Sequence, residues 1–447
     1  MSNTKDPRQW FQDLIDKSEN LLPFSDIDWL KNTRSEARNA LIKLPIPQRK
    51  LENWRYSNIN KLFDTDFEPV QAKASERVEL DIDDYLLDGI DSYRLVINNG
   101  HCIDSLSNID ALPEGVKLTS LRQALATDPE SLSTWFGHAS RQNQEIFTSL
   151  NTALVNDGLF VHIAPGVQLD KPIEVIYINH SIESSLMIQL RNLLVLENNA
   201  SATLIERYLS KDQSLYFNNN LTEIVLDESA SLKHYRIQDE CKQAFHLGSI
   251  FLNQKASSVY KDTTISMGGA WARTDFNVDF KDEHAVCHLN GLYMVGDQQL
   301  TDCHLNIQHK APNCASQHTF KGILYGKGRA VFDGLIYVDK LAQGTDAHLS
   351  NDNLMLTRKA EVDTKPQLEI YADDVKCSHG TTVGQLEPEQ IFYMRSRGID
   401  EDKAHKMLCM GFADEIVNTI DIEALRIYVD DVLQNTLSSI NNSLTEL

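Results

Sequence analysis

Short runs in which apolar and polar residues alternate occupy the middle of this 447-residue chain, from about residue 157 to residue 386. The runs are rich in Val, Ile, Tyr and Thr, and such alternation is typical of β-strands. No amphipathic stretch longer than two helical turns interrupts these roughly 230 residues, whereas repeated βαβ units would need a crossover helix between parallel strands. The pattern therefore predicts a core made of β-strands.

Apolar residues at helical spacing flank this core on both sides, with one strand-like run at 93–100. The expected helical stretches are residues 5–64, 120–126, 142–154, 388–396, 404–410 and 422–444. Pro388 suits the first turn of the first C-terminal helix. We therefore expect a helical or mixed N-terminal domain (1–156), a β core (157–386) and a C-terminal helical domain (387–447).

A degenerate repeat runs along the core. In each copy an apolar strand end leads through a few polar residues to an alanine and then into the next strand. The alanines are Ala200, Ala230, Ala256, Ala285, Ala330 and Ala360, at intervals of 30, 26, 29, 45 and 30 residues. A turn that recurs at such a period is typical of a solenoid, and a small residue suits a crowded corner between strands.

Two architectures agree with this repeat. An antiparallel sandwich would also have polar turns, but the recurring period favours a parallel β-helix. A β-helix needs its ends covered, because open rungs present unpaired strand edges and an exposed apolar core. Helical segments on both flanks fit that need.

Composition narrows the function further. A formal net charge of −22 and the absence of a long Lys/Arg block argue against binding of nucleic acid or anionic lipid. Seven cysteines, an odd number at irregular spacing with no Cys-x-x-Cys, indicate a reduced, cytoplasmic protein. The first residues have no apolar signal region, and nowhere do 18 apolar residues follow one another, so neither secretion nor a membrane span is expected.

Common catalytic motifs are absent from the sequence. The nearest match to a phosphate-binding P-loop, GILYGKG from Gly322, lacks the spacing and the hydroxyl, and neither Gly-x-Ser-x-Gly nor His-Glu-x-x-His occurs. One window is rich in metal-binding residue types: Cys287, His288, Cys303, His304, His309, Cys314 and His318. Adjacent strand residues point to opposite faces, so its neighbouring Cys-His pairs are poorly placed to chelate one zinc ion.

The residues best suited by type and spacing to bind a metal ion together are Cys377 and His379. If the strand at 368–375 continues, residues two apart share one face, and the thiol and the imidazole project together near the end of a β element. Two ligands are too few for a structural zinc site, which needs four. The simpler interpretation is a part-buried cysteine beside a hydrogen-bonded histidine.

The sequence from 354 to 412 resembles the C-terminal part of the SufB/SufD family of iron–sulfur cluster assembly proteins. The matching runs are LMLTRKAEVDTKPQLEIYADDVKCSHGTTVGQLEPEQIFYMRSRGI, AHKMLCMGF, FDGLIYVDKLAQGTDAHLSNDNL, His309-x-x-Pro312-x-x-x-Ser316 and PIPQRKLENWRY at 45–56. The similarity extends over essentially the whole chain. SufB-type members carry His-Glu-Ala where this sequence has Ser378-His379-Gly380, so the resemblance is to SufD-type members.

The resemblance implies a mainly β protein, a right-handed parallel β-helix capped by N- and C-terminal helical domains. It implies a non-catalytic scaffold that pairs with SufB through the β-helix and with the ATPase SufC through the C-terminal helices, so that nucleotide chemistry belongs to SufC. His379, as a metal ligand shared with the partner, and nearby Cys377 would serve a transient iron–sulfur cluster; no cofactor would be bound stably by this chain alone. The residues expected to contact SufC are Phe392, Tyr393, Arg395, Arg397 and Gly398.

The chemistry agrees with this expectation. Iron–sulfur clusters bind thiolates, and imidazole can replace some of them. Cys377 and His379 would supply two ligands from this chain, which is half of a cluster site shared with a partner. A cluster held weakly in this way can leave the scaffold. The alternatives are a purely structural β-solenoid homodimer without a metal role and, less favoured because acids are dispersed, a β-helix carbohydrate-active enzyme.

Overall fold

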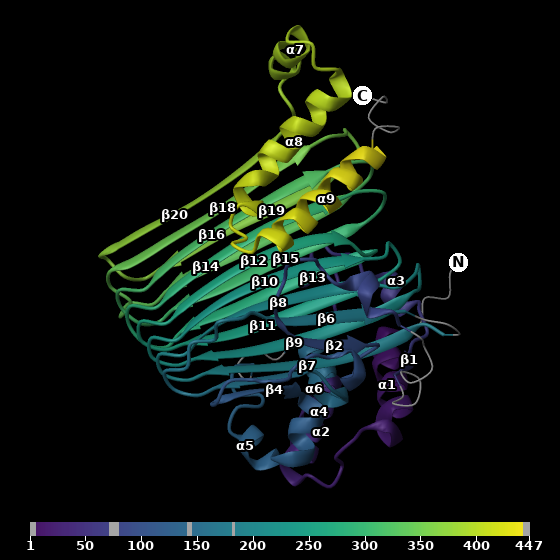
Figure 1. Cartoon of the computed structure of the whole chain (residues 1–447), viewed down its shortest axis with the longest axis vertical. Coiled ribbons are helices and arrows are strands. Elements are labelled where there is room, and N and C mark those ends of the chain that lie inside the picture. The colour runs from purple at the N-terminus through teal and green to yellow at the C-terminus, as the bar shows by residue number, and fades with distance from the viewer. Residues whose placement is uncertain (1–5, 71–79, 141–144, 181–183, 441–447) are drawn as a thin grey trace.

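The computed structural model describes residues 6–70, 80–140, 145–180 and 184–440, and its centre is a solenoid of two facing sheets (Figure 1). From β5 to β20, each strand pairs in parallel with the strand two places further along the chain, so successive strands alternate between the sheets. Two consecutive strands, one in each sheet, make one rung of the solenoid. There are eight rungs from β5 to β20: the first is β5 and β6, and the last is β19 and β20. The predicted parallel β-solenoid is confirmed, and the antiparallel sandwich is excluded.

The strands belong to two sheets. Sheet A contains β1 (Glu68–Pro69), β4 (Val116–Ser120), β5 (Leu159–Ile163), β7 (Leu186–Leu196), β9 (Tyr216–Leu226), β11 (Phe245–Gln254), β13 (Trp271–Phe280), β15 (Leu300–His309), β17 (Arg329–Val338) and β19 (Glu361–Ile370). Sheet B contains β2 (Tyr93–Asn98), β3 (His101–Cys102), β6 (Ile173–Asn179), β8 (Ser201–Ser210), β10 (Ser231–Glu240), β12 (Val259–Gly268), β14 (Val286–Val295), β16 (Ala315–Leu324), β18 (Thr345–Met355) and β20 (Val375–Gly384).

A column of small buried residues forms one corner of the solenoid. Its members are Ala200, Ala230, Ser258, Ala285, Cys314 and Thr345, all buried; the first five directly precede a sheet B strand, and Thr345 is the first residue of one. The backbone carbonyl of each of the first five accepts a hydrogen bond from the next rung, beginning with the Ser231 N–H to Ala200 (2.9 Å). The residue before each member has a left-handed backbone, with φ of 58° at Asn199 and 75° at Gly344, which turns the chain sharply into the next sheet.

This column corrects the repeat inferred from the alanines. Ser258, not Ala256, stacks on Ala230 and Ala285, because Val259 pairs with both Ser231 and Val286 in the ladder. Ala330, the second residue of β17, and Ala360, directly before β19, lie instead near the opposite corner, where the chain returns from sheet B to sheet A. The true column has intervals of 30, 28, 27, 29 and 31 residues, more regular than the alanines suggested.

The N-terminal helices gather on the outer face of sheet A around its first rungs (Figure 1). They are α1 (Pro7–Ser18), α2 (Asp28–Lys43), α3 (Asn60–Phe63), α4 (Leu121–Thr127), α5 (Pro129–Ser133) and α6 (Ile146–Leu154). An aromatic cluster seals this contact, with Trp10 and Phe147 against Phe217 of β9. The strand-like run predicted at 93–100 joins sheet B as β2, parallel to β6. The predicted start of α6 at 142–144 lies outside the described residues.

The C-terminal helices α7 (Pro388–Ser396), α8 (Glu401–Val417) and α9 (Glu423–Ile440) follow β20. Helices α8 and α9 lie along the outer face of sheet B through apolar residues such as Ile416 and Leu425, while α7 projects beyond the last rung (Figure 1). Helix α8 starts before the predicted 404–410 because the Asp400 side chain accepts a hydrogen bond from the Lys403 N–H. The predicted end of α9 at 444 lies outside the described residues.

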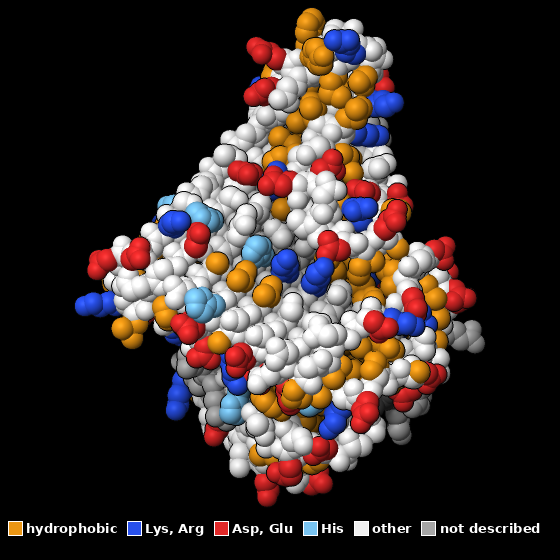
Figure 2. All heavy atoms as spheres, turned by 60° about the vertical axis from the view of Figure 1, so that its left-hand side comes forward, with side chains coloured by type: hydrophobic (Ala, Val, Ile, Leu, Met, Phe, Trp, Pro, Cys, Tyr) orange, Lys and Arg blue, Asp and Glu red, His pale blue; other side chains and the backbone are white. Residues whose placement is uncertain are grey.

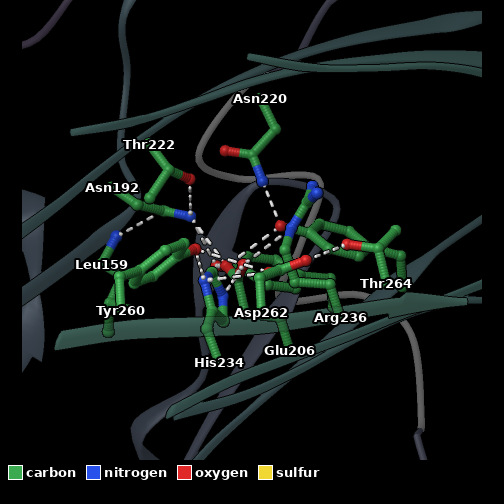
Figure 3. Close-up of polar contacts among 12 residues, drawn as sticks. Leu159, Asn192, Glu206, Asn220, Thr222, His234, Arg236, Tyr260, Asp262 and Thr264 are labelled. Carbon is green, nitrogen blue, oxygen red and sulfur yellow. Dashed lines mark hydrogen bonds and ion pairs between the residues drawn. The ribbon is translucent and has the colours of Figure 1, made fainter. Parts of the chain in front are cut away.

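A network of polar side chains lies in the interior of the first four rungs (Figure 3). Glu206 on β8 is at its centre. Its carboxylate accepts hydrogen bonds from the hydroxyls of Tyr177 (2.9 Å) and Tyr208 (3.0 Å) and from the Asn192 amide (3.0 Å). It also lies 2.8 Å from Nε2 of His234 on β10. These contacts join strands of successive rungs and both sheets, so they fix the register of the stack.

The network balances charge in a space without water access. Arg236 lies 3.4 Å from Glu206, and the Thr264 hydroxyl donates to Asp262 (2.7 Å). Burial alone would raise the pKa of Glu206, but the His234 hydrogen bond and charge, with that of Arg236, outweigh it and lower the pKa to about 2. Burial raises the pKa of Asp262. Because all of these groups are buried, the network belongs to the core and is closed to ligands.

We expect Glu206→Gln to lower the free energy of unfolding at pH 7 by about 3–5 kcal/mol, because it leaves Arg236 in the core without its carboxylate partner. The folded-state pKa is below the ordinary 4.5, so the contribution of Glu206 is present above pH 4.5 and is lost as pH falls towards about 2. Urea denaturation at pH 7 and at lower pH checks both statements. The exposed Glu228→Gln is the matched control, and a pH-independent difference between parent and Glu206→Gln would contradict the assignment.

Candidate functional site

The last rung of the solenoid is open. Within the described part of the chain, β19 pairs only with β17 and β20 only with β18, so each has one edge without a strand partner. Most residues of β20 are exposed. The C-terminal helices lie beside this rung and leave it uncovered (Figure 1). An unpaired, ordered edge of this kind is a template for another strand. We call the exposed part of β19 and β20, with the turn between them, the rim.

Cys377 and His379 lie on the rim and share one face of β20. Their neighbours in the ladder are Ala347 and Leu349 of β18, which are 0% and 3% exposed and face the interior. Both side chains therefore point inwards at the open end of the solenoid, which we call its mouth. The prediction that they share one face is confirmed.

The position of the pair along its strand was predicted wrongly. The strand expected at 368–375 does not continue to residue 377, because β19 ends at Ile370 and a turn leads into β20 at Val375. The turn buries Ala372 against the core and carries the chain from sheet A to sheet B. The pair thus lies near the start of the last strand.

The two side chains differ in their surroundings. Cys377 is half-buried against the apolar interior, whereas His379 is exposed. Burial raises the pKa of the Cys377 thiol above its usual 9.0; the Ala347 backbone N–H opposes this shift and Asp346 adds to it. The thiol is therefore protonated at neutral pH and would become a ligand only when a metal ion displaces its proton.

Apolar and hydroxyl side chains surround this pair on the rim. Ile370, Tyr371 and Val383 are exposed there, and Thr364 of β19 meets Thr381 of β20 at 3.2 Å. No three His, Cys, Asp or Glu side chains in the described ranges come together so that they could hold a metal ion. A metal at the rim would therefore need ligands from outside this chain.

The window of cysteines and histidines between 287 and 318 is divided between the two faces of the sheets. Cys287 and His318 are buried in the interior, whereas His288, the sequence neighbour of Cys287, faces outwards. His318 has no hydrogen-bond partner within the described chain, and burial lowers its pKa to about 3. These side chains form separate contacts and not one site.

The five residues predicted to contact a partner gather on α7 and directly after it. Helix α7 buries none of its residues, and Phe392 and Tyr393 are 74% and 59% exposed. The Arg397 guanidinium lies over the Tyr393 ring and bonds its hydroxyl (3.2 Å), and Arg395 pairs with Glu401 (2.9 Å). Figure 2 shows apolar side chains concentrated on this projecting tip. Gly398 ends α7 with φ of 84°.

Sequence reasoning missed two features. Met407 on α8 is an exposed apolar residue, but an isolated methionine gave no signal. A groove with a volume of about 270 Å³ lies on the outer face of sheet A beside Trp54 and Glu145. In its lining, Arg273 bonds Asp275 and stacks on Trp54 at 4.1 Å, so these contacts join the N-terminal segment to the sheet.

The fold and the rim define a β-solenoid protein with a thiol and an imidazole on a last rung whose outer strand edges have no partner among the described residues. Two family models match the chain: "SUF system FeS cluster assembly, SufBD core domain" at residues 177–412 and "SufBD protein N-terminal region" at residues 5–175. The chain therefore belongs to the SufBD family of the Suf iron–sulfur cluster assembly system.

Relatives named after this system cover nearly the whole chain. An iron–sulfur cluster assembly SufBD family protein of Synechocystis is 33% identical over 89% of each chain. Iron–sulfur cluster assembly protein SufD of Escherichia coli is 32% identical over 86% of this chain and 88% of its own. SufD of Bacillus subtilis is 25% identical over 91% and 93%. These similarities are consistent with the SufD-type resemblance of the Cys377–His379 segment.

We expect alkylation of Cys377 by iodoacetamide to be slower than that of a free thiol at pH 7.5 and to accelerate as pH rises past 9, because burial disfavours the thiolate. Mass spectrometry of the peptide that contains Cys377 measures the rate. Fully buried Cys287 is the internal control and should react only on unfolding. A Cys377 that reacts rapidly at pH 6 would contradict the raised pKa.

Proposed function

We propose that this protein is a non-catalytic scaffold on which an iron–sulfur cluster is assembled. The observation that carries the proposal is the inward-facing Cys377 and His379 on an open rung. Thiolate and imidazole are both ligands of such clusters. Since one chain supplies only two donors, the site is half of a shared one. The cluster is the cargo of this site, held transiently, and the chain alone needs no stable cofactor.

The partner at the rim is SufB, through the ends of both β-helices. Family resemblance suggests this partner, and the geometry supports it, since two unpaired strand edges and exposed apolar residues frame the donor pair. In the absence of SufB, the same edges would accept a second copy of this chain, which gives a homodimer. A homodimer without a metal role is the alternative function, and a donor substitution distinguishes the two.

The second partner is the ATPase SufC, bound by the C-terminal helices. Helix α7 stands away from the solenoid with its aromatic residues exposed, which is typical of a surface that anchors another protein. The sequence has no P-loop, so ATP chemistry would come from that partner. No helix within the described ranges is long and apolar enough to span a bilayer. We place the assembly in the cytoplasm, where thiols stay reduced.

We expect His379→Ala to reduce cluster content in the complex with SufB and SufC by about tenfold, as is usual for loss of a metal ligand or its support. Iron and acid-labile sulfide, measured after anaerobic reconstitution, give the content. The matched control is Thr382→Ala, on the same strand but facing outwards. Parental cluster content in His379→Ala, with the complex intact, would leave only a structural role for this chain.

We expect the double substitution Phe392→Glu/Tyr393→Glu to abolish copurification with SufC, because loss of two aromatic anchors and the added charge each disfavour a docked interface. The control is Ile427→Glu, which changes an exposed apolar residue on α9. Copurification from coexpressed subunits is the measurement. If the double variant retains SufC and Ile427→Glu loses it, the contact lies on α9 instead.

A further inference from the structure

The outer face of β20 carries a contact that sequence inspection did not reveal. Ser378 lies between Cys377 and His379, so its side chain points away from the interior. Its ladder neighbour on β18 is His348. The Ser378 hydroxyl lies 2.6 Å from Nδ1 of His348, and Nε2 of the same ring lies 2.7 Å from Oδ1 of Asp346. Ser378, His348 and Asp346 thus form a row of contacts. Because Asp346 and His348 are both on β18, this row links the last two strands of sheet B.

This row acts at the point where the strand is least supported. Among the residues that the structure describes, strand β20 has a partner strand on one edge only, and most of its residues are exposed. Edge strands slip or open more readily than central ones, because half of their backbone groups are unpaired. Adjacent side chains leave a strand on opposite faces. The contact of Ser378 with His348 on the outer face therefore keeps the side chains of Cys377 and His379 pointing inwards.

We propose that Asp346, His348 and Ser378 are positioning residues that hold Cys377 and His379 towards the mouth of the solenoid. Asp346 orients the imidazole of His348, and the imidazole anchors the Ser378 hydroxyl to β18. The inference rests on the proposed function for its meaning in cluster assembly. The positioning itself is a property of the isolated chain and is measured there.

A second contact on the same strand provides the control. The Thr382 hydroxyl donates to Asp352 of β18 at 2.5 Å. It is on the same outer face as Ser378, between the same two strands, but it lies four residues further along. Loss of this contact should loosen β20 to a similar extent without acting next to Cys377.

The experiment compares Ser378→Ala, His348→Ala, Ser378→Thr and Thr382→Val in the isolated full-length protein. The rate of iodoacetamide alkylation of Cys377 is the first measurement, and the thermal midpoint shows that each variant is folded. Ser378→Ala and His348→Ala should raise the rate about two- to tenfold, the change expected when one hydrogen bond that resists local opening is lost. Ser378→Thr keeps the hydroxyl and should restore the parental rate, and Thr382→Val should leave it unchanged.

The second measurement uses the complex reconstituted with SufB, SufC, iron and sulfide. Ser378→Ala should change the absorption and electron paramagnetic resonance spectra of the cluster, and Ser378→Thr should restore them. Equal alkylation rates in Ser378→Ala, His348→Ala, Thr382→Val and the parent would overturn the positioning role. If His379→Ala leaves cluster content unchanged while Ser378→Ala still exposes Cys377, the cluster function fails and the positioning role stands.

Discussion

Backbone pairing between successive rungs is the constraint on which the rest of this structure depends. A strand in a parallel sheet satisfies its amides and carbonyls only with a neighbour on each edge. At the first rungs, the antiparallel strands β3 and β4 and the N-terminal helices end the sheets. At the last rung, no described segment ends the sheets beyond β19 and β20 in this way. The same pairing that makes the core rigid therefore produces an ordered surface with unmet hydrogen-bonding capacity, and the donor pair lies on that surface.

The solenoid could be predicted from sequence because its cause is local and repeated. Alternating strands without helices exclude βαβ units, and a turn with a small residue recurs once per rung. The error at Ala256 shows the limit of that reasoning. Serine fills the corner at 258 as well as alanine does, so residue identity marks the corner less reliably than backbone geometry. The left-handed φ of Ser257 has no reliable sequence signal, since serine is not among the residue types enriched there.

The candidate site was predicted in part. The spacing of Cys377 and His379 gave their shared face, because that depends only on the period of a strand. They lie at the start of β20, and not at the end of a longer strand, because a turn at residues 371–374 separates β19 from β20. The sequence there contains no Gly or Pro that would have indicated this turn. Contacts such as Glu206 with His234, or Ser378 with His348, join residues about 30 apart. They require the register of one rung on the next, which no single segment of sequence contains.

Because the corners stack one on another, the solenoid can change in length only by complete turns. Between 27 and 31 residues separate equivalent corner positions, and each turn of chain advances both sheets by one strand spacing, about 4.8 Å. Insertion or deletion of a complete turn would move the mouth towards or away from the N-terminal helices by that step and leave the terminal strand unaltered. Chains built on this plan can thus change the distance between the rim and the N-terminal helices only in fixed steps, without redesign of either end.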